Sequence, residues 1–246
     1  PAVAHASPNY ITRSQSTPLN EPFYSDSRLP QQWHYGLING PIAWQLALEG
    51  GDGVNVAVLD TGLFHSGGQW HPDLNSNVLR GFDAVDGGLP IDPGNAVGGN
   101  VYHGTHVAGT VAAADNGSGG VGMAFGAGLI PVRVLGEGGT GTLADLLEAM
   151  RGTLGCGPIE KADIVNLSLG GLPCDDPAVS DPTVEGSLQS LINDGVAAGV
   201  IYVAAAGNSA TSQPSCPAGL DNVFSVSAVD GAGRLASYSN FGPSID

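Results

Sequence analysis

The sequence predicts an α/β domain of three layers, in which helices cover both faces of a doubly wound, mostly parallel sheet. Short and almost continuously apolar runs are typical of strands that are buried on both faces of such a sheet. These runs alternate along the chain with longer segments of helical periodicity. In addition, 39 glycines and an aromatic content of only 6% indicate small-residue packing and many tight turns.

The first predicted strand is VNVAVLD (54–60), whose apolar residues lead directly to Asp60. Later runs share this character, for example GLIPVRVL (128–135) and VIYVAAAGN (200–208). Strands of this kind need no polar face, because helices cover both sides of the sheet. The predicted strands are 54–60, 128–135, 162–170, 200–208 and 222–230.

The predicted helices lie between these strands. TLADLLEAMRGTL (142–154) is amphipathic at helical spacing, and SLQSLINDGVAAG (187–199) has a similar pattern. HGTHVAGTVAAA (103–114) is built mainly from small residues, which favours a helix packed closely on its sheet. Strand and helix therefore alternate through most of the chain.

The chain is expected to divide into two parts. Residues 1–30 are rich in Pro, Ser, Asn and Thr without a sustained period, which predicts an N-terminal arm or the remnant of a pro-segment. Residues 31–246 are long enough to form one domain with a large core. No stretch approaches the ~20 apolar residues of a membrane helix, and the N-terminus lacks a signal pattern. We therefore expect no membrane partner and an already processed chain.

The charge of the chain is strongly negative. Seven Lys and Arg residues face 23 Asp and Glu residues, so the formal net charge is −16. Nucleic acids and anionic membrane surfaces would be repelled, which excludes them as expected partners. The imbalance fits an exported protein that binds divalent cations, and it equally fits a solvated acidic surface.

Polar residues follow several predicted strands, at the edge where parallel-sheet proteins form their sites. Asp60 in VLDTG could accept a hydrogen bond from an imidazole and fix its tautomer. His103, at the start of a helix, could act as a general base. Asn208 in AAGNS could direct its carboxamide N–H at the oxygen of an attacked carbonyl. Taken alone, an Asp at a strand end is more often a turn or cap residue, and Asn208 could instead form a local turn, so each of the three residues is weak evidence by itself.

His106 follows His103 at a spacing that two metal ligands on one helix could use. A zinc peptidase helix would carry H-E-x-x-H, whereas Gly104 and Thr105 follow His103 here. We therefore interpret His106 as a packed helix residue rather than a ligand.

Together these motifs closely resemble those of the subtilisin-like serine proteases. They are VLDTG (58–62), HGTHVAGT (103–110), NLSLGG (166–171) and AAGNS (205–209). The resemblance covers roughly residues 31–246, and HGTHVAGT is its most specific motif. It implies a subtilisin-like fold and a catalytic triad in the chain order Asp, His, Ser. Asp60 would orient the base, His103 would be the general acid and base, and Asn208 would donate to the oxyanion.

The resemblance also implies a nucleophile that these residues do not include. In this family an SNFGP-like turn leads to a G-T-S-M-A motif whose Ser attacks the substrate, whereas here YSNFGPSID (238–246) ends the sequence. Ser168 matches the wall of the substrate cleft and Ser209 merely follows Asn208, so neither is expected to replace it. We expect a domain that is incomplete at the C-terminus, with the Ser on a further segment of the same precursor. The alternative is an inactive, peptide-binding relative.

The resemblance further implies where a protein or peptide substrate binds. Two segments would pair with an extended substrate backbone, and the S1 pocket would lie between 204–207 and 215–219. Neither stretch carries a charge, which favours apolar or aromatic P1 residues. The expected substrate-binding residues are Gly139, Thr140, Gly141, Ser168, Leu169, Gly170, Ala205, Ala206, Gly207 and Ser215.

Structural Ca²⁺ is the cofactor that the resemblance implies. Carboxylate and amide oxygens suit this hard cation. A Gln at position 31 or 32 would contribute from the N-terminal side. The acidic segment 83–95 either holds a further ion or forms a solvated loop. The expected metal ligands are Asp73, Asp115 and Asn116.

Three cysteines, Cys156, Cys174 and Cys216, lack the spacing of a zinc site, so one disulfide and one thiol are expected. Both Cys174–Cys216 and Cys156–Cys174 are considered as the pairing. The complete prediction is a secreted, calcium-stabilised serine endopeptidase that is made with a pro-peptide.

Overall fold

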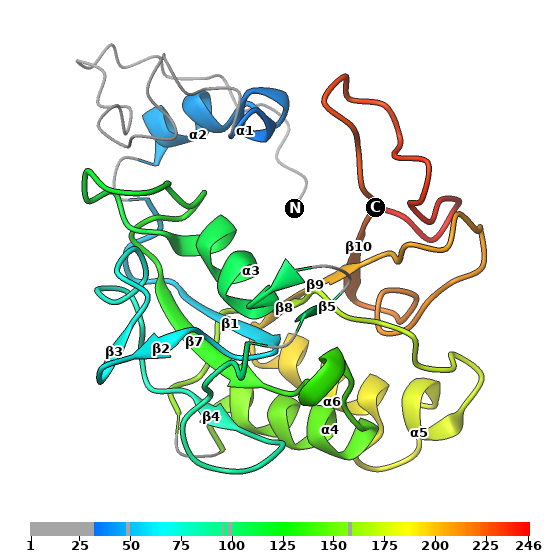
Figure 1. The fold of residues 1–246 in the computed structure, drawn as a ribbon. Coiled ribbons are helices and arrows are strands. Elements are labelled where there is room, and N and C mark those ends of the chain that lie inside the picture. Colours follow the sequence, from blue (N-terminus) through cyan, green and yellow to red (C-terminus); the bar gives the residue numbers. More distant parts are fainter. Residues whose placement is uncertain (1–31, 48–49, 95, 98–99, 157–158) are drawn as a thin grey trace, which may run out of the picture.

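A six-stranded parallel sheet runs through the centre of the molecule, in the order β10-β9-β8-β1-β7-β4 (Figure 1). The structure is a computed structural model that describes residues 32–246 apart from 48–49, 95, 98–99 and 157–158. The predicted N-terminal arm, 1–30, lies outside the described residues. The strands of the sheet are β1 (Asn55–Asp60), β4 (Phe82–Asp83), β7 (Gly128–Arg133), β8 (Ile164–Leu167), β9 (Ile201–Ala205) and β10 (Val223–Val226).

All predicted strands are confirmed, although each is shorter than its apolar run. The three predicted helices are confirmed as α3 (His103–Ala112), α4 (Leu143–Arg151) and α6 (Leu188–Ala197). In Figure 1, α3 lies above the sheet, and α4, α5 (Pro177–Ser180) and α6 lie below it. The predicted three-layer α/β arrangement is therefore confirmed.

Shorter elements connect this framework, and their sequences are too short to show a helical or strand periodicity.

The start of α4 is stabilised by a capping box, in which the side chains of Thr142 and Asp145 each accept a hydrogen bond from the other residue's backbone N–H. None of the helices in the described part of the chain has the length and apolar character that a membrane span needs. The remaining elements are α1 (His34–Leu37), α2 (Gly40–Leu46), the hairpins β2 (His65–Ser66) with β3 (Gln69–Trp70) and β5 (Ala96–Val97) with β6 (Asn100–Val101), and the turns Glu137–Gly139 and Gly152–Cys156.

The core lies on both faces of β1, as its apolar run predicts. Ala57 and Leu59 belong to the large cluster that also contains residues of α4 and α6. Val58 points to the other face and packs in a second cluster with Ala108 of α3. Because alternate residues of β1 are buried on opposite sides, Asp60 at its end is held firmly in the middle of the domain.

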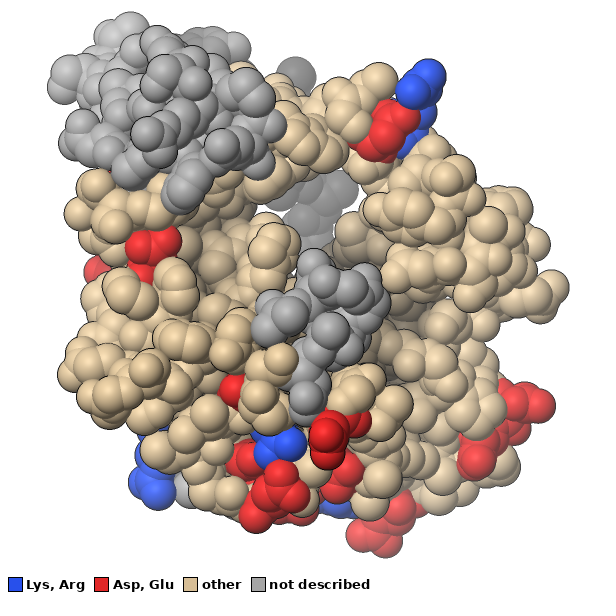
Figure 2. Space-filling model, in the orientation of Figure 1, with Lys and Arg blue, Asp and Glu red and all other residues tan. Residues whose placement is uncertain are grey.

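The outer strands β9 and β10 are buried on one face only. Ile201, Phe224 and Val226 are 47%, 54% and 52% exposed, whereas Tyr202 and Val223 on the opposite face are buried. Apolar side chains at this level of exposure on adjacent strands form a patch, which we call the open face (Ile201, Phe224, Val226). In Figure 2, acidic side chains instead gather toward the lower part of the view, around α4 and α5.

A disulfide joins the segment after β8 to the segment after β9. Cys174 and Cys216 form this bond, with their Cα atoms 5.4 Å apart. It confirms one of the two pairings that were considered, so the pairing of Cys156 with Cys174 is wrong.

Candidate active site

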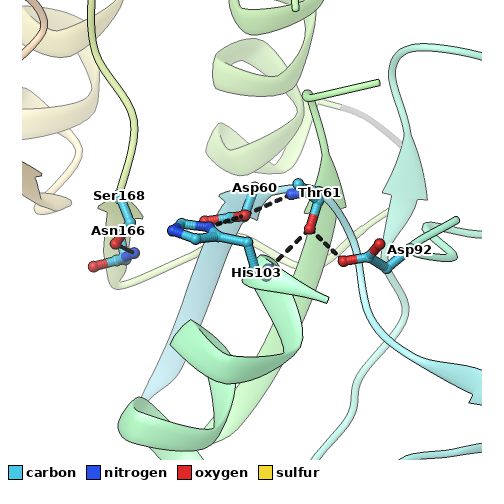
Figure 3. A network of polar contacts seen from close by, with 7 residues as sticks. Asp60, Thr61, Asp92, His103, Asn166 and Ser168 are labelled. Atoms are coloured by element: carbon cyan, nitrogen blue, oxygen red, sulfur yellow. Dashed lines mark hydrogen bonds and ion pairs between the residues drawn. The ribbon is translucent and has the colours of Figure 1, made fainter. Parts of the chain in front are cut away.

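Asp60 and His103 meet at the carboxyl end of β1. His103 Nδ1 lies 2.7 Å from Asp60 Oδ1 (Figure 3). Asp60 is fully buried, and its Oδ1 also accepts a hydrogen bond from the Thr61 N–H at 2.7 Å. The side chain of His103 remains 21% exposed. A neutral imidazole that donates Nδ1–H to a carboxylate keeps Nε2 free to accept a proton, so this ring can act as a general base.

The contact with Asp60 also changes the proton affinity of the imidazole. The hydrogen bond to Asp60 raises the pKa of His103 above its ordinary value of 6.5, and burial of the ring opposes this effect. The negative charges of Asp60 and Asp92 raise the pKa further. The imidazolium form is therefore stabilised, which is what a base needs when it has taken a proton from a nucleophile.

Two glycines allow α3 to start against the turn that follows β1. Gly62 has φ = 93°, and a Cβ there would lie 2.5 Å from the carbonyl oxygen of Pro90. A Cβ on Gly104 would lie 2.3 Å from the carbonyl oxygen of Gly62. A larger residue at Gly104 would push the start of α3 away from the turn, and one at Gly62 would push the segment 90–92 away from it. Gly104 of the motif HGTHVAGT thus permits the contact between Asp60 and His103.

A buried network that we did not predict lies behind this pair. The Thr61 hydroxyl donates to Asp92 Oδ2 and accepts a hydrogen bond from the Gly104 N–H at 2.9 Å (Figure 3). The other oxygen of Asp92 accepts from the Gly94 N–H at 2.8 Å. Burial raises the pKa of Asp92, and the hydrogen bonds partly offset that rise. The only signal in the sequence was that Thr61 belongs to the motif VLDTG.

The acidic segment 83–95 has two buried carboxylates, those of Asp83 and Asp92, and an exposed one, that of Asp86. Arg133 Nη1 at the end of β7 lies 2.6 Å from Asp83 Oδ2 and 2.6 Å from Asp86 Oδ2. Asp83 and Asp92 are both buried. The interpretation of this segment as a solvated loop is therefore wrong for these two residues, which are bonded to protein groups.

A cavity of about 480 Å³ lies at the carboxyl ends of β8 and β9. It contains most of the residues expected to bind substrate, together with the expected oxyanion donor, and no charged residue lines it. The cavity is bounded by two segments that are far apart in sequence and joined by the disulfide. The candidate residues that line it are Ser168, Leu169, Gly170, Ala205, Gly207, Asn208 and Ser215.

The register of the sheet places this cavity beside the Asp60–His103 pair. β8 pairs with both β1 and β9 without a break, and continuing that register sets Asp60, Ser168 and Ala205 at the same level. Adjacent strands lie ~4.8 Å apart, so the backbones of Asp60 and Ala205 are separated by roughly 10 Å. Figure 3 shows Asn166 and Ser168 on the side of His103 that faces away from Asp92.

Asn240 fixes the loop that carries Asn208, and we did not predict this role. Its Oδ1 accepts from the Ser209 N–H at 2.9 Å, and its Nδ2 donates to the Ala206 carbonyl at 2.8 Å. The side chain is buried, so it holds both sides of the Gly207–Asn208 peptide in place. Its place in the turn-like stretch YSNFGP was the only sequence signal.

The remaining candidates lie apart from the cavity. Gly139, Thr140 and Gly141 lie in the loop after β7 and do not line it, and Ala206 is buried behind the lining. His106 is exposed on α3 and lines a different cavity, so its interpretation as a packed residue is wrong.

The expected metal ligands gather around the loop after α3. Asp73 Oδ2 accepts from the Gly120 N–H at 3.2 Å, and Gln32 Nε2 donates to the Val121 carbonyl at 3.0 Å. The N-terminal glutamine at the loop is thus Gln32, while Gln31 lies outside the described residues. Two exposed residues of the same loop complete the set of candidates, Asp115 and Asn116.

Comparison with known proteins assigns the family. Residues 51–246 match the model of the subtilase family. The chain is a subtilase. An extracellular protease of Xanthomonas campestris pv. campestris is 38% identical over 90% of this chain and 41% of its own length. A thermophilic serine proteinase of Bacillus sp. strain AK1 is 37% identical over 100% of this chain and 54% of its own length.

Other subtilase relatives agree with this assignment. Subtilisin BL of Lederbergia lenta is 36% identical over 87% of this chain and 69% of its own length. A solved structure of a protease from Pseudoalteromonas arctica PAMC 21717 has a TM-score of 0.74 and 36% identity, covering 92% of this chain and 70% of that one. The subtilisin-like fold is therefore confirmed. This subtilase chain spans about half the length of the Xanthomonas and Bacillus relatives, at 41% and 54%.

Proposed function

We propose that this subtilase chain is part of a secreted serine endopeptidase that hydrolyses peptide bonds by acyl transfer. The observation that carries the proposal is the 2.7 Å contact between His103 Nδ1 and Asp60 Oδ1. In this mechanism His103 takes the proton of a serine hydroxyl and later gives it to the leaving amine. Asp60 stabilises the imidazolium, and Asn208 donates a hydrogen bond to the oxyanion. Secretion is supported by the disulfide and by the similarity to an extracellular protease.

The nucleophile in this proposal is a serine outside the 246 residues, because no G-T-S-M-A motif occurs among them. The open face supports a further segment of the precursor as its carrier. Burying one large apolar side chain contributes about 1.5–3 kcal/mol, so a segment that packs on Ile201, Phe224 and Val226 would stabilise the domain appreciably. We propose that the segment with the serine covers this face.

The substrate in this proposal is a protein or peptide bound in extended form. The backbone at Ser168–Gly170 and at Gly139–Gly141 would pair with the substrate backbone on its two sides. The P1 side chain would enter the cavity beside Ala205 and Ser215. An apolar or aromatic P1 residue fits best, because a charged one would lose its hydration without gaining a partner in this lining.

Labelling of the full-length native protein with a fluorophosphonate tests this function. We expect a single labelled serine outside residues 1–246, located by peptide mass spectrometry. His103→Ala should abolish labelling, because the serine loses its base. His106→Ala is the matched control, three residues further on the same helix and exposed, and it should label normally.

The possible results separate the competing interpretations. Absence of labelling in folded protein would indicate the inactive, peptide-binding relative. Labelling of Ser168 or Ser209 would show that the nucleophile has been assigned wrongly.

We also propose a structural Ca²⁺ at the loop after α3. The side chains of Gln32 and Asp73 reach this loop from two other segments of the chain, and the oxygen of each accepts a hydrogen bond from a backbone N–H of the loop. Among the described residues no three His, Cys, Asp or Glu side chains are grouped as metal ligands. Amide and backbone carbonyl oxygens would therefore supply most ligands, which Ca²⁺ accepts and zinc does not.

Removal of calcium should lower thermal stability. A ligand at a hundredfold excess over its Kd stabilises the folded state by about 2.7 kcal/mol. For a domain of this size a chelator should then lower Tm by roughly 5–10 °C in a calorimetric scan. Asp73→Asn should abolish most of this response, and Asp175→Asn, an exposed acidic control, should not. A Tm that is unchanged by the chelator would contradict the proposal. Loss of activity that is faster than unfolding would indicate a catalytic metal instead.

A further inference from the structure

The helix that carries His103 begins without a capping side chain of its own. Its N-cap residue, Tyr102, has φ = 60° and ψ = 51° and makes no side-chain cap hydrogen bond. In most helices a Ser, Thr, Asp or Asn at this position accepts from the N–H of the second or third helical residue. Tyr102 cannot do so, because its hydroxyl is at the far end of a rigid ring. The free N–H groups at the start of α3 must therefore find other acceptors.

Thr61 supplies one of these acceptors from the turn after β1. The N–H of Gly104, the second residue of α3, donates to the Thr61 hydroxyl oxygen at 2.9 Å. Thr61 is fully buried, so water does not compete effectively for this bond. A threonine 43 residues away in the sequence thus performs the task of an N-cap residue.

Asp92 determines the direction of the Thr61 hydroxyl. A hydroxyl has one hydrogen and two lone pairs, and here the hydrogen is donated to Asp92 Oδ2. The lone pairs are consequently left for the Gly104 N–H. The carboxylate also lies near the positive end of the α3 dipole, which stabilises the helix start further.

The backbone around Asp92 holds its carboxylate in place. The Asp92 N–H donates to the Leu63 carbonyl at 2.9 Å, and the Leu63 N–H donates to the Pro90 carbonyl at 2.8 Å. The segment 90–92 is therefore fastened to the same turn that contains Thr61. The carboxylate of Asp92, the hydroxyl of Thr61 and the start of α3 are therefore connected by hydrogen bonds (Figure 3).

We infer that Thr61 and Asp92 act as an external N-cap of α3 and are positioning residues for the general base His103. Asp60 and His103 make one contact between β1 and α3, and the residues that follow them, Thr61 and Gly104, make a second. Two contacts between adjacent residues fix both the distance and the rotation of the helix start relative to β1. The catalytic part of this inference rests on the proposed function.

The effect of the Asp92 charge on the pKa of His103 gives a second way to test this arrangement. The carboxylates that act on His103 are Asp60 at the end of β1 and Asp92 behind it, and both raise its pKa. Arg133 at the end of β7 is the cation that acts on Asp92. Removing the charge of Asp92 should therefore lower the pKa of His103, although the Asp60 contact remains.

The test uses variants of the full-length protein and two measurements. Thr61→Val keeps the shape and removes the hydroxyl, Thr61→Ser keeps the hydroxyl, and Asp92→Asn removes the charge. Asp52→Asn is the control, because it removes a charge from an exposed residue just before β1, at the end of that strand opposite to Asp60. We would measure kcat and KM on a peptide substrate, and titrate the His103 ring by NMR.

We expect Thr61→Val to lower kcat by roughly 10- to 100-fold with KM unchanged, since a misplaced base affects only the chemical step. Thr61→Ser should remain close to the wild type. Asp92→Asn should lower both kcat and the pKa of His103, and Asp52→Asn should change neither. A Thr61→Val enzyme within twofold of the wild type, or an unchanged His103 pKa in Asp92→Asn, would overturn the inference.

Two further features keep the test decisive. Asp92→Asn preserves the side-chain shape, so it carries the test if Thr61→Val does not fold. A folded wild-type protein that hydrolyses no peptide would contradict the proposed function, whereas the NMR titration would still report whether Asp92 acts on His103.

Discussion

Asp60→Asn is expected to lower kcat by about 10⁴, as the corresponding change does in the serine protease triad, with a small effect on KM. The amide can present N–H to His103 and thereby favour the tautomer that cannot accept a proton at Nε2. Steady-state kinetics of the full-length protein would measure this loss. In a His103→Ala background the same substitution should cost almost nothing more, because the two residues act as one unit. Full additivity of the two losses would contradict the assigned roles.

The pH dependence provides an independent test of the pair. His103 must be neutral to act as a base, so kcat/KM should rise as pH increases through its pKa, which lies above the ordinary 6.5. In Asp60→Asn this acidic limb should move to lower pH, because the main cause of the raised pKa is removed. The free energy of unfolding depends on pH in the opposite direction to kcat/KM. The stabilisation that His103 gains from Asp60 is fully present below the ordinary pKa of histidine, and it is lost as pH rises through the raised pKa of His103.

Asn208→Ala is expected to have the second largest effect, a fall in kcat of about 10²–10³ with little change in KM. This is the size of effect found when the oxyanion asparagine of subtilisin, a member of the same family, is removed. The carboxamide would bond only to the charge that develops on the attacked carbonyl, so substrate binding should be preserved. Ser209→Ala, at the adjacent position, is the control and should keep wild-type kinetics. Unchanged turnover in Asn208→Ala would remove this residue from the mechanism.

The parts of the fold that the sequence predicted are those in which a local pattern has a single physical meaning. β1 was predictable because both of its faces are buried, so the residues from Val56 to Leu59 are all apolar. α3 was predictable from its motif, although not the direction of each of its side chains. Ala108 faces the sheet and His106 faces away, and only the packed structure shows which face of a helix of small residues is buried.

The parts of the site that were missed depend on contacts between distant and weakly patterned segments. Asp92 lies in an acidic stretch that resembles a surface loop, and its partner Thr61 is 31 residues away. Asn240 lies in a turn, and its bonds reach back to Ala206 across 34 residues. Such residues follow no helical or strand periodicity. Each is required by one buried polar contact, and not by its position on the buried face of a helix or strand.

The disulfide between Cys174 and Cys216 determines how the domain tolerates cleavage of its chain. The two cysteines are 42 positions apart in the sequence, and the segment between them contains α5, α6, β9 and the loop with Asn208. If the chain is cut anywhere within this segment, both fragments stay covalently attached. A single nick therefore cannot release either wall of the cavity from the domain.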